Sequence, residues 1–320
     1  MKKTLLLALL SLSVAGFRPI WGFFAHQKIN RLAVFTLPGG MIGFYKNNIG
    51  YITRAAVNPD RRRYALAEEA SRHFLDVDHY GDSALAVLPH DWREAAARYG
   101  EDSLRAHGIL PWHLYRMYFR LRDAFMVRDP DEILKVSAEL GHYIGDAHVP
   151  LHTTENYNGQ LTGQEGIHGF WESRLPEVFS GDYNFFVGRA QYISDIRKAC
   201  WQVIASTHEQ VARVLAEEKK LALRYEEKKY SFETRGNETV KVYAIEYARD
   251  YHRRLEGMVE KQMRASIKMT GDFWFTAWVD AGQPDLKKLI DHKPGKEELE
   301  ENREALREWK TKRLKVREHE

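Results

Sequence analysis

The chain has little cysteine, little net charge and few long hydrophobic runs, and each of these absences excludes a class of protein. A single cysteine, Cys200, excludes an internal disulfide. Basic residues number 48 and acidic residues 45, and the excess is made up by Lys2, Lys3 and Arg18, which excludes a generic basic nucleic-acid binder. Only 10 prolines and 22 glycines stand among 320 residues, so the chain is neither collagen-like nor linker-rich. With 44% hydrophobic residues, it is predicted to be globular with a substantial core.

The longest apolar run stands near the start and follows two lysines. Residues 5–10 are all apolar, and the run is too short for a helix of about 20 residues to cross a bilayer. This pattern is typical of a signal peptide over residues 1–20, with a membrane anchor or a buried first helix as the alternative. We therefore expect an exported protein, periplasmic or secreted, without stable membrane insertion.

The rest of the chain has helical periodicity almost throughout, and strand-like alternation is scarce. The sequence Asp129-Pro130-Asp131-Glu132 is typical of a helix start, and this helix should run to about Ala147. Two further long helices are expected over about 195–225 and about 240–281, and Gly271 is a point where the second can divide. The fold class is predicted to be all-α.

No internal repeat or low-complexity linker divides the chain, so a single-domain multi-helix bundle is expected over residues 21–290. Residues 291–320 are rich in charges of both signs. They are predicted to form a solvated helical tail, with partner binding as the weaker alternative.

Histidines and carboxylates cluster in the middle of the sequence. His142 and Asp146 are four residues apart on one predicted helix face, as are His168 and Glu172, and His152 lies between the two pairs. One such pair is usually a salt bridge. Two pairs and a further histidine within 31 residues would leave unpaired buried charges unless a cation binds them, and imidazole and carboxylate suit zinc.

Three other stretches complete an ordered series of metal-binding residue types. They are Asn58-Pro-Asp60-Arg61, Arg72-His73-Phe-Leu-Asp-Val-Asp78 and Trp21-Gly-Phe-Phe-Ala-His26. Together with the central pairs, this series resembles the all-helical three-zinc phosphoesterases. That superfamily comprises bacterial zinc-dependent phospholipase C and the single-strand-specific nucleases of fungi and plants.

The resemblance implies three Zn²⁺ ions and nine ligands. Asp60, His73, His142 and Asp146 would hold one ion, and Asp146 would bridge to a second ion held by His26 and by the backbone of Trp21. His152, His168 and Glu172 would hold the third. Asp60 also matches a catalytic residue that orients the attacking water and acts as its base. The resemblance requires the mature chain to begin at Trp21, although Arg18-Pro19-Ile20 is a poor signal-peptidase site.

The implied reaction is the hydrolysis of a phosphate ester by metal-activated water. Some features resemble the phospholipase branch, such as Glu172 and the short gap between His152 and His168. Others resemble the nuclease branch, such as the five-residue step from Trp21 to His26. The expected substrate is a phospholipid, with single-stranded nucleic acid or a nucleotide as the alternative. A non-catalytic exported zinc-binding protein is the alternative of another class.

The remaining candidates have simpler interpretations. His148 is expected to be packed rather than a ligand, and Cys200 to be a buried small hydrophobe. Aromatic residues near the ligands are interpreted either as substrate contacts or as ordinary packing. These are Phe74, Tyr157, Phe170 and Trp171. Isolated histidines are expected to be surface or core residues. These are His79, His90, His107, His113, His208 and His252.

Overall fold

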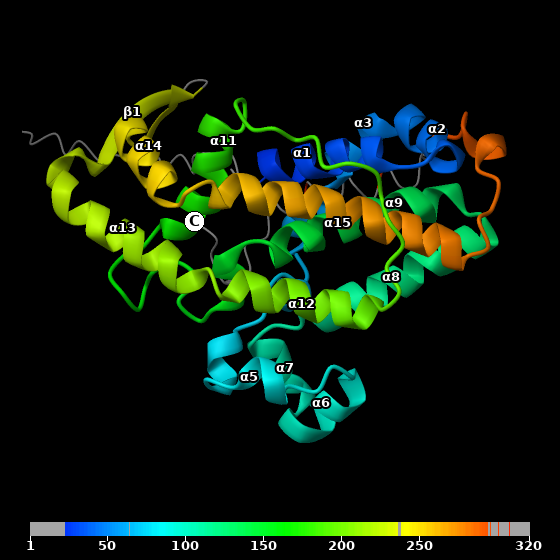
Figure 1. Ribbon diagram of the computed structural model, residues 1–320, viewed down its shortest axis with the longest axis horizontal. Coiled ribbons are helices and arrows are strands. Elements are labelled where there is room, and N and C mark those ends of the chain that lie inside the picture. Colours follow the sequence, from blue (N-terminus) through cyan, green and yellow to red (C-terminus); the bar gives the residue numbers. More distant parts are fainter. Residues whose placement is uncertain are drawn as a thin grey trace, which may run out of the picture.

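A computed structural model describes residues 23–63, 65–235 and 238–293, together with the single residues 295, 300 and 307. Within them the protein is mostly helical, as predicted, with one short β-hairpin (Figure 1). The expected signal peptide at 1–20, Trp21 and nearly all of the expected tail lie outside the described residues. No helix in the described ranges combines the length and the apolar character needed to cross a membrane.

The α-helices have the following bounds. They are α1 Phe23–Ala33, α2 Gly39–Asn47, α3 Ile49–Ala55, α4 Asn58–Arg62, α5 Ala84–Val87, α6 Trp92–Tyr99, α7 Glu101–Ala106, α8 Leu110–Val127, α9 Pro130–Ala147, α10 Ile167–Gly169, α11 Leu175–Phe179, α12 Ile196–His208, α13 Val211–Tyr225, α14 Ile245–Arg254 and α15 Met258–Asp280.

Shorter elements connect them. They are the 3₁₀ turns η1 Val34–Thr36, η2 Ala70–Arg72, η3 Val77–Tyr80, η4 Pro150–Thr153, η6 Glu226–Lys229 and η7 Lys287–Leu289, the π-helical turn η5 Phe170–Arg174, and the strands β1 Tyr230–Arg235 and β2 Glu238–Tyr243. The strands pair antiparallel, with Tyr230 opposite Tyr243.

The main core lies where α8, α9 and α15 pack against one another, with α1 along one side and α12 along the other (Figure 1). Helix α9 begins where the sequence predicts, because the Asp129 side chain accepts hydrogen bonds from the backbone N–H groups of Asp131 and Glu132, both at 3.1 Å. Fourteen of its residues are buried, so α9 is the central helix of the bundle. Any side chain that α9 contributes to a site is therefore rigidly placed.

A second hydrophobic cluster lies beside α13 and α14. Phe170 stacks on Tyr243 with ring centroids 3.8 Å apart and on Tyr251 at 4.9 Å. These aromatic rings come from β2, α14 and the π-helical turn. They fix the π-helical turn, which follows His168 and contains Glu172.

Two helix predictions were wrong in detail. The segment 195–225 is divided at Glu209–Gln210 into α12 and α13. The segment 240–281 begins as strand β2, and its helices divide at residues 255–257 rather than at Gly271. Gly271 lies inside α15 and does not end it. A Cβ at this position would meet Thr36 Oγ1 at 1.9 Å, so the glycine permits α15 to pack closely against Thr36.

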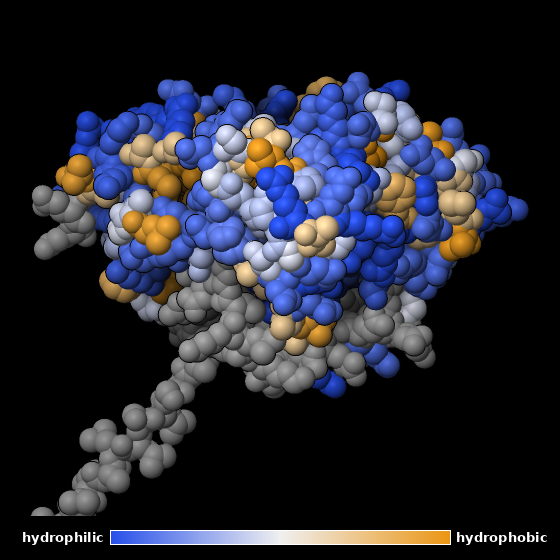
Figure 2. Space-filling model, turned by 90° about the horizontal axis from the view of Figure 1, so that it is seen from below, coloured by the Kyte–Doolittle hydropathy of each residue, from blue (hydrophilic) through white to orange (hydrophobic). Residues whose placement is uncertain are grey.

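Helices α5, α6 and α7 form a small group that projects from one side of the bundle (Figure 1). They face the viewer in Figure 2, where hydrophobic residues occur in small separate groups among hydrophilic ones. The chain enters this group through η3 and leaves it at His107, close to the segments that carry His73 and His152.

Candidate metal centre

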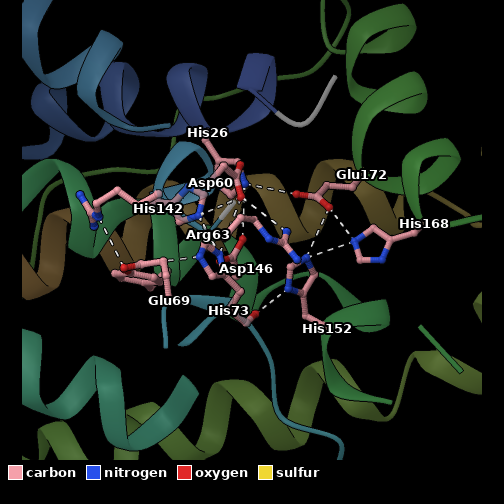
Figure 3. A network of polar contacts seen from close by, with 12 residues as sticks. His26, Asp60, Arg63, Glu69, His73, His142, Asp146, His152, His168 and Glu172 are labelled. Atoms are coloured by element: carbon pink, nitrogen blue, oxygen red, sulfur yellow. Dashed lines mark hydrogen bonds and ion pairs between the residues drawn. The ribbon is translucent and has the colours of Figure 1, made fainter. Parts of the chain in front are cut away.

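Four side chains form what we call the central cluster: Asp60, His73, His142 and Asp146 (Figure 3). Asp146 Oδ2 lies 2.9 Å from His73 Nδ1 and 3.3 Å from His142 Nε2. Asp60 Oδ1 lies 3.8 Å from the same His73 nitrogen and 3.6 Å from the same His142 nitrogen. Both histidines therefore direct one ring nitrogen at the same pair of carboxylates.

Helix packing explains how this cluster is positioned. His142 and Asp146 lie one turn apart in the last part of α9, while Asp60 lies in the first turn of α4. Helix α1 approaches α9 closely because residue 145 is glycine, and a Cβ there would lie 2.7 Å from His26 Nδ1. The sequence Gly-His-Tyr-Ile-Gly-Asp thus supplies two polar side chains and the space for a third.

His152, His168 and Glu172 form what we call the outer cluster. His152 Nδ1 donates to the backbone oxygen of His73 at 2.5 Å, which leaves its Nε2 facing the other two side chains. His168 Nε2 lies 3.2 Å from His152 Nε2 and 2.8 Å from Glu172 Oε2. The segment 170–174 is π-helical, a conformation that is frequent at functional sites.

His26 connects the two clusters. Its Nε2 lies 3.4 Å from Asp146 Oδ1 and 3.2 Å from Glu172 Oε1 (Figure 3). Both carboxylates therefore face His26 with one oxygen and a histidine pair with the other. Of the nine predicted ligands, the eight described ones meet in one continuous buried network, and Trp21 lies outside the described residues.

The donor set fits divalent cations. Two pairs of imidazole nitrogens face each other at 3.1 and 3.2 Å, and each pair also faces a carboxylate oxygen. At most one hydrogen can lie between two such nitrogens, whereas a single cation is coordinated by both lone pairs. In each of three groups of this network the ligand atoms lie within 4.8 Å of one another, so each group could hold a metal ion.

The electrostatics of the site favour added positive charge. Burial would lower the pKa of His26, but its hydrogen bond to Glu172 and the charge of Asp146 raise it to about 9. Burial would raise the pKa values of Asp146 and Glu172, but the surrounding histidines hold both well below their usual range. The carboxylates therefore stay ionised and attract either a proton or a metal ion to the imidazoles.

Two further charged side chains belong to this region, and sequence reasoning missed both. Glu69 is fully buried, and its Oε1 lies 3.7 Å from His73 Nε2, on the side of the ring away from Asp146. Arg63 is also buried, with Nη1 3.8 Å from Asp60 Oδ1. The only sequence signal for them is their position, three and four residues from a predicted ligand.

The other expectations near the site are resolved by burial. His148 is packed, as predicted, and its Nδ1 donates to the Ile144 carbonyl. Burial lowers the pKa of its imidazole to about 4. Phe74, Phe170 and Trp171 are buried core residues, which confirms their packing interpretation. Tyr157 is half-buried, with its ring edge-on to His168.

Comparison with known proteins adds no assignment. Neither protein-family models nor curated proteins give a significant match to this chain. The helical fold and the buried clusters of potential metal ligands therefore define its class as a mostly helical protein with several possible metal sites.

Proposed function

We propose that this protein is an exported zinc-dependent phosphodiesterase that hydrolyses phosphate esters, phospholipids first among them. The observation that carries the proposal is the convergence of five histidines and three carboxylates on one buried network. All are nitrogen and oxygen donors, and the outer cluster offers three protein ligands, as catalytic zinc sites do, rather than a closed set of four.

The ligand assignment follows the sequence resemblance. The central cluster would hold one zinc, His26 with Asp146 and Trp21 a second, and the outer cluster the third. When bound, zinc would lower the pKa of a water molecule toward neutrality and polarise a phosphoryl oxygen. Every other contribution comes from the residues of the chain.

Asp60 is placed to handle the proton of the attacking water. Its side chain is 12% exposed whereas that of Asp146 is 1% exposed, so Asp60 is the carboxylate of the central cluster that solvent reaches. In the proposed reaction the water oxygen bonds to phosphorus as the ester P–O bond breaks. Asp60 orients the water and accepts its proton, which then passes through solvent to the leaving oxygen.

Arg63 adds a buried positive charge next to Asp60. Its guanidinium lies 3.8 Å from Asp60, and its side chain is only 2% exposed, so it would act on a substrate through its positive charge rather than by direct contact. A positive group there would attract a phosphodiester and offset the charge that develops on the phosphoryl oxygens. This explains how a chain without a basic excess beyond residue 18 can select an anionic substrate.

A side-by-side assay tests the reaction and the substrate class. Zinc-loaded protein is given phosphatidylcholine vesicles or single-stranded DNA. The proposal predicts release of the phosphorylated headgroup, and Asp60→Asn should lower the rate by at least about 100-fold. Asp82→Asn, which alters an exposed carboxylate, is the matched control and should leave the rate unchanged.

The assay has two contradicting outcomes. Turnover of DNA alone would replace the phospholipase with a nuclease that uses the same site. A folded, zinc-loaded protein that hydrolyses neither substrate, and that a chelator unfolds, would support the non-catalytic zinc-binding protein instead.

Export is part of the proposal and rests on the pattern of residues 1–20. If the free amine of Trp21 is a ligand, the mature chain must begin there. N-terminal sequencing of exported protein should therefore give Trp-Gly-Phe. A chain that begins elsewhere would remove Trp21 from the ligand set.

A further inference from the structure

A second group of metal-binding residue types lies outside the buried network. His79, His107 and Glu155 come from three separate segments, and we call them the surface cluster. Sequence analysis interpreted the two histidines as isolated residues. In the structure their rings stack with centroids 3.2 Å apart, and both Nδ1 atoms face the same carboxylate oxygen.

The distances within the cluster are close to those of a coordination sphere. Glu155 Oε1 lies 3.3 Å from His79 Nδ1 and 3.7 Å from His107 Nδ1. With zinc–ligand bonds of roughly 2.0–2.2 Å, tetrahedral geometry separates neighbouring ligand atoms by about 3.3–3.6 Å. Asp76 Oδ2 lies 3.7 Å from the same His107 atom and adds a neighbouring carboxylate to the cluster.

The backbone holds these residues together without a ligand. Asp76 N donates to the His107 carbonyl at 2.8 Å, and Glu155 N donates to Asp78 Oδ1 at 2.9 Å. The histidine and glutamate side chains are between 25% and 44% exposed, so a cation can enter from solvent and keep water on its open positions. The site is therefore accessible and its segments are held together, and the two stacked rings need only turn to direct both Nδ1 atoms at one ion.

The chemistry of the donors selects the ion. Two imidazoles with carboxylates suit zinc and other divalent transition metals, whereas calcium and magnesium prefer oxygen donors alone. We propose that the surface cluster binds one divalent transition-metal ion, zinc in the first instance, through His79, His107 and Glu155, with water on its remaining positions.

The site has a structural consequence for the buried network. His79 follows His73 by six residues and Glu155 follows His152 by three, and the two segments are joined by the bond from Leu75 N to the His152 carbonyl. An ion in the surface cluster would link the segment 73–79 to the segment 152–155. It therefore stabilises the folded protein by mass action whether or not the buried site is catalytic.

Zinc titration of chelator-stripped protein tests the proposal, with native mass spectrometry for stoichiometry and calorimetry for affinity. Wild type should bind one zinc more than the double variant H79Q/H107Q, and E155Q should weaken the same binding step by at least tenfold. His90→Gln, at another exposed histidine, is the control and should behave as wild type.

Two further readouts keep the outcome clear. Zinc should raise the melting temperature of wild type more than that of H79Q/H107Q, and anomalous scattering from zinc-soaked crystals should place an ion beside the two Nδ1 atoms and the Glu155 carboxylate. H152Q should lose a different equivalent of zinc, which separates this site from the buried one. Equal stoichiometry and affinity in wild type and H79Q/H107Q, or no density at the cluster, would overturn the proposal.

Discussion

Glu69 offers a sharp test of the buried centre because it contacts a predicted ligand without being one itself. His73 directs Nδ1 toward Asp146 and Asp60, and its other nitrogen faces Glu69 at 3.7 Å. A carboxylate behind a metal-binding histidine fixes the tautomer and makes the ring a stronger donor. Glu69 is ionised, because His73, Arg62 and Arg72 hold its pKa well below the usual range despite burial.

We expect Glu69→Gln to weaken zinc binding by 10- to 100-fold, the loss found when such partners are removed, which corresponds to about 1.4–2.7 kcal/mol. Competition with a chelator of known affinity measures it. Glu139→Gln is the matched control. Glu139 is also buried, and it pairs with Arg62 at 2.5 Å. Equal losses in both variants, or none in Glu69→Gln, would refute the role of Glu69.

Three more predictions follow from the same contacts. Asp146→Asn should lower zinc content and phosphodiesterase activity together, because Asp146 faces His26, His73 and His142. Full activity in this variant would contradict the assignment of Asp146 as a ligand. Gly145→Ala should weaken zinc binding by displacing His26, whereas Gly39→Ala, where a Cβ meets no atom within 4 Å, should not, and unchanged zinc affinity in both would contradict this packing. His113→Asn should flatten the loss of stability in acid. Burial and nearby arginines hold the pKa of His113 well below 6.5, so only the unfolded state gains its proton as the pH falls below 6.5. The free energy of unfolding of chelator-treated wild type should then fall relative to the variant by up to about 1.4 kcal/mol per pH unit, and parallel pH profiles would contradict it.

The sequence predicts the fold class and the start of α9 because both depend on local signals. Hydrophobic periodicity specifies helices, and the Asp129-Pro130 pair specifies a cap, wherever the helix finally packs. The hairpin was missed because its strands are short and half-exposed. Its pairing depends on packing of Tyr243 against Phe170, 73 residues earlier in the chain.

The site residues also differ in whether local sequence spacing predicts them. His142 with Asp146 and His168 with Glu172 are found from their spacing, since each pair shares one helical turn. Glu69 has the same four-residue spacing from His73, which sequence reasoning did not use, whereas the surface cluster has no such signal. His79, His107 and Glu155 meet only because backbone hydrogen bonds bring three distant segments together, and that information lies in the tertiary structure.

Metal content tests the central claim most directly. Elemental analysis should be made on H79Q/H107Q protein exposed to zinc and desalted, so that the surface cluster contributes nothing. We predict tightly bound zinc that falls by one equivalent when His152 and His168 are both replaced by glutamine. A correctly folded protein that retains no metal after the same treatment would contradict the assignment of the buried network as a metal centre.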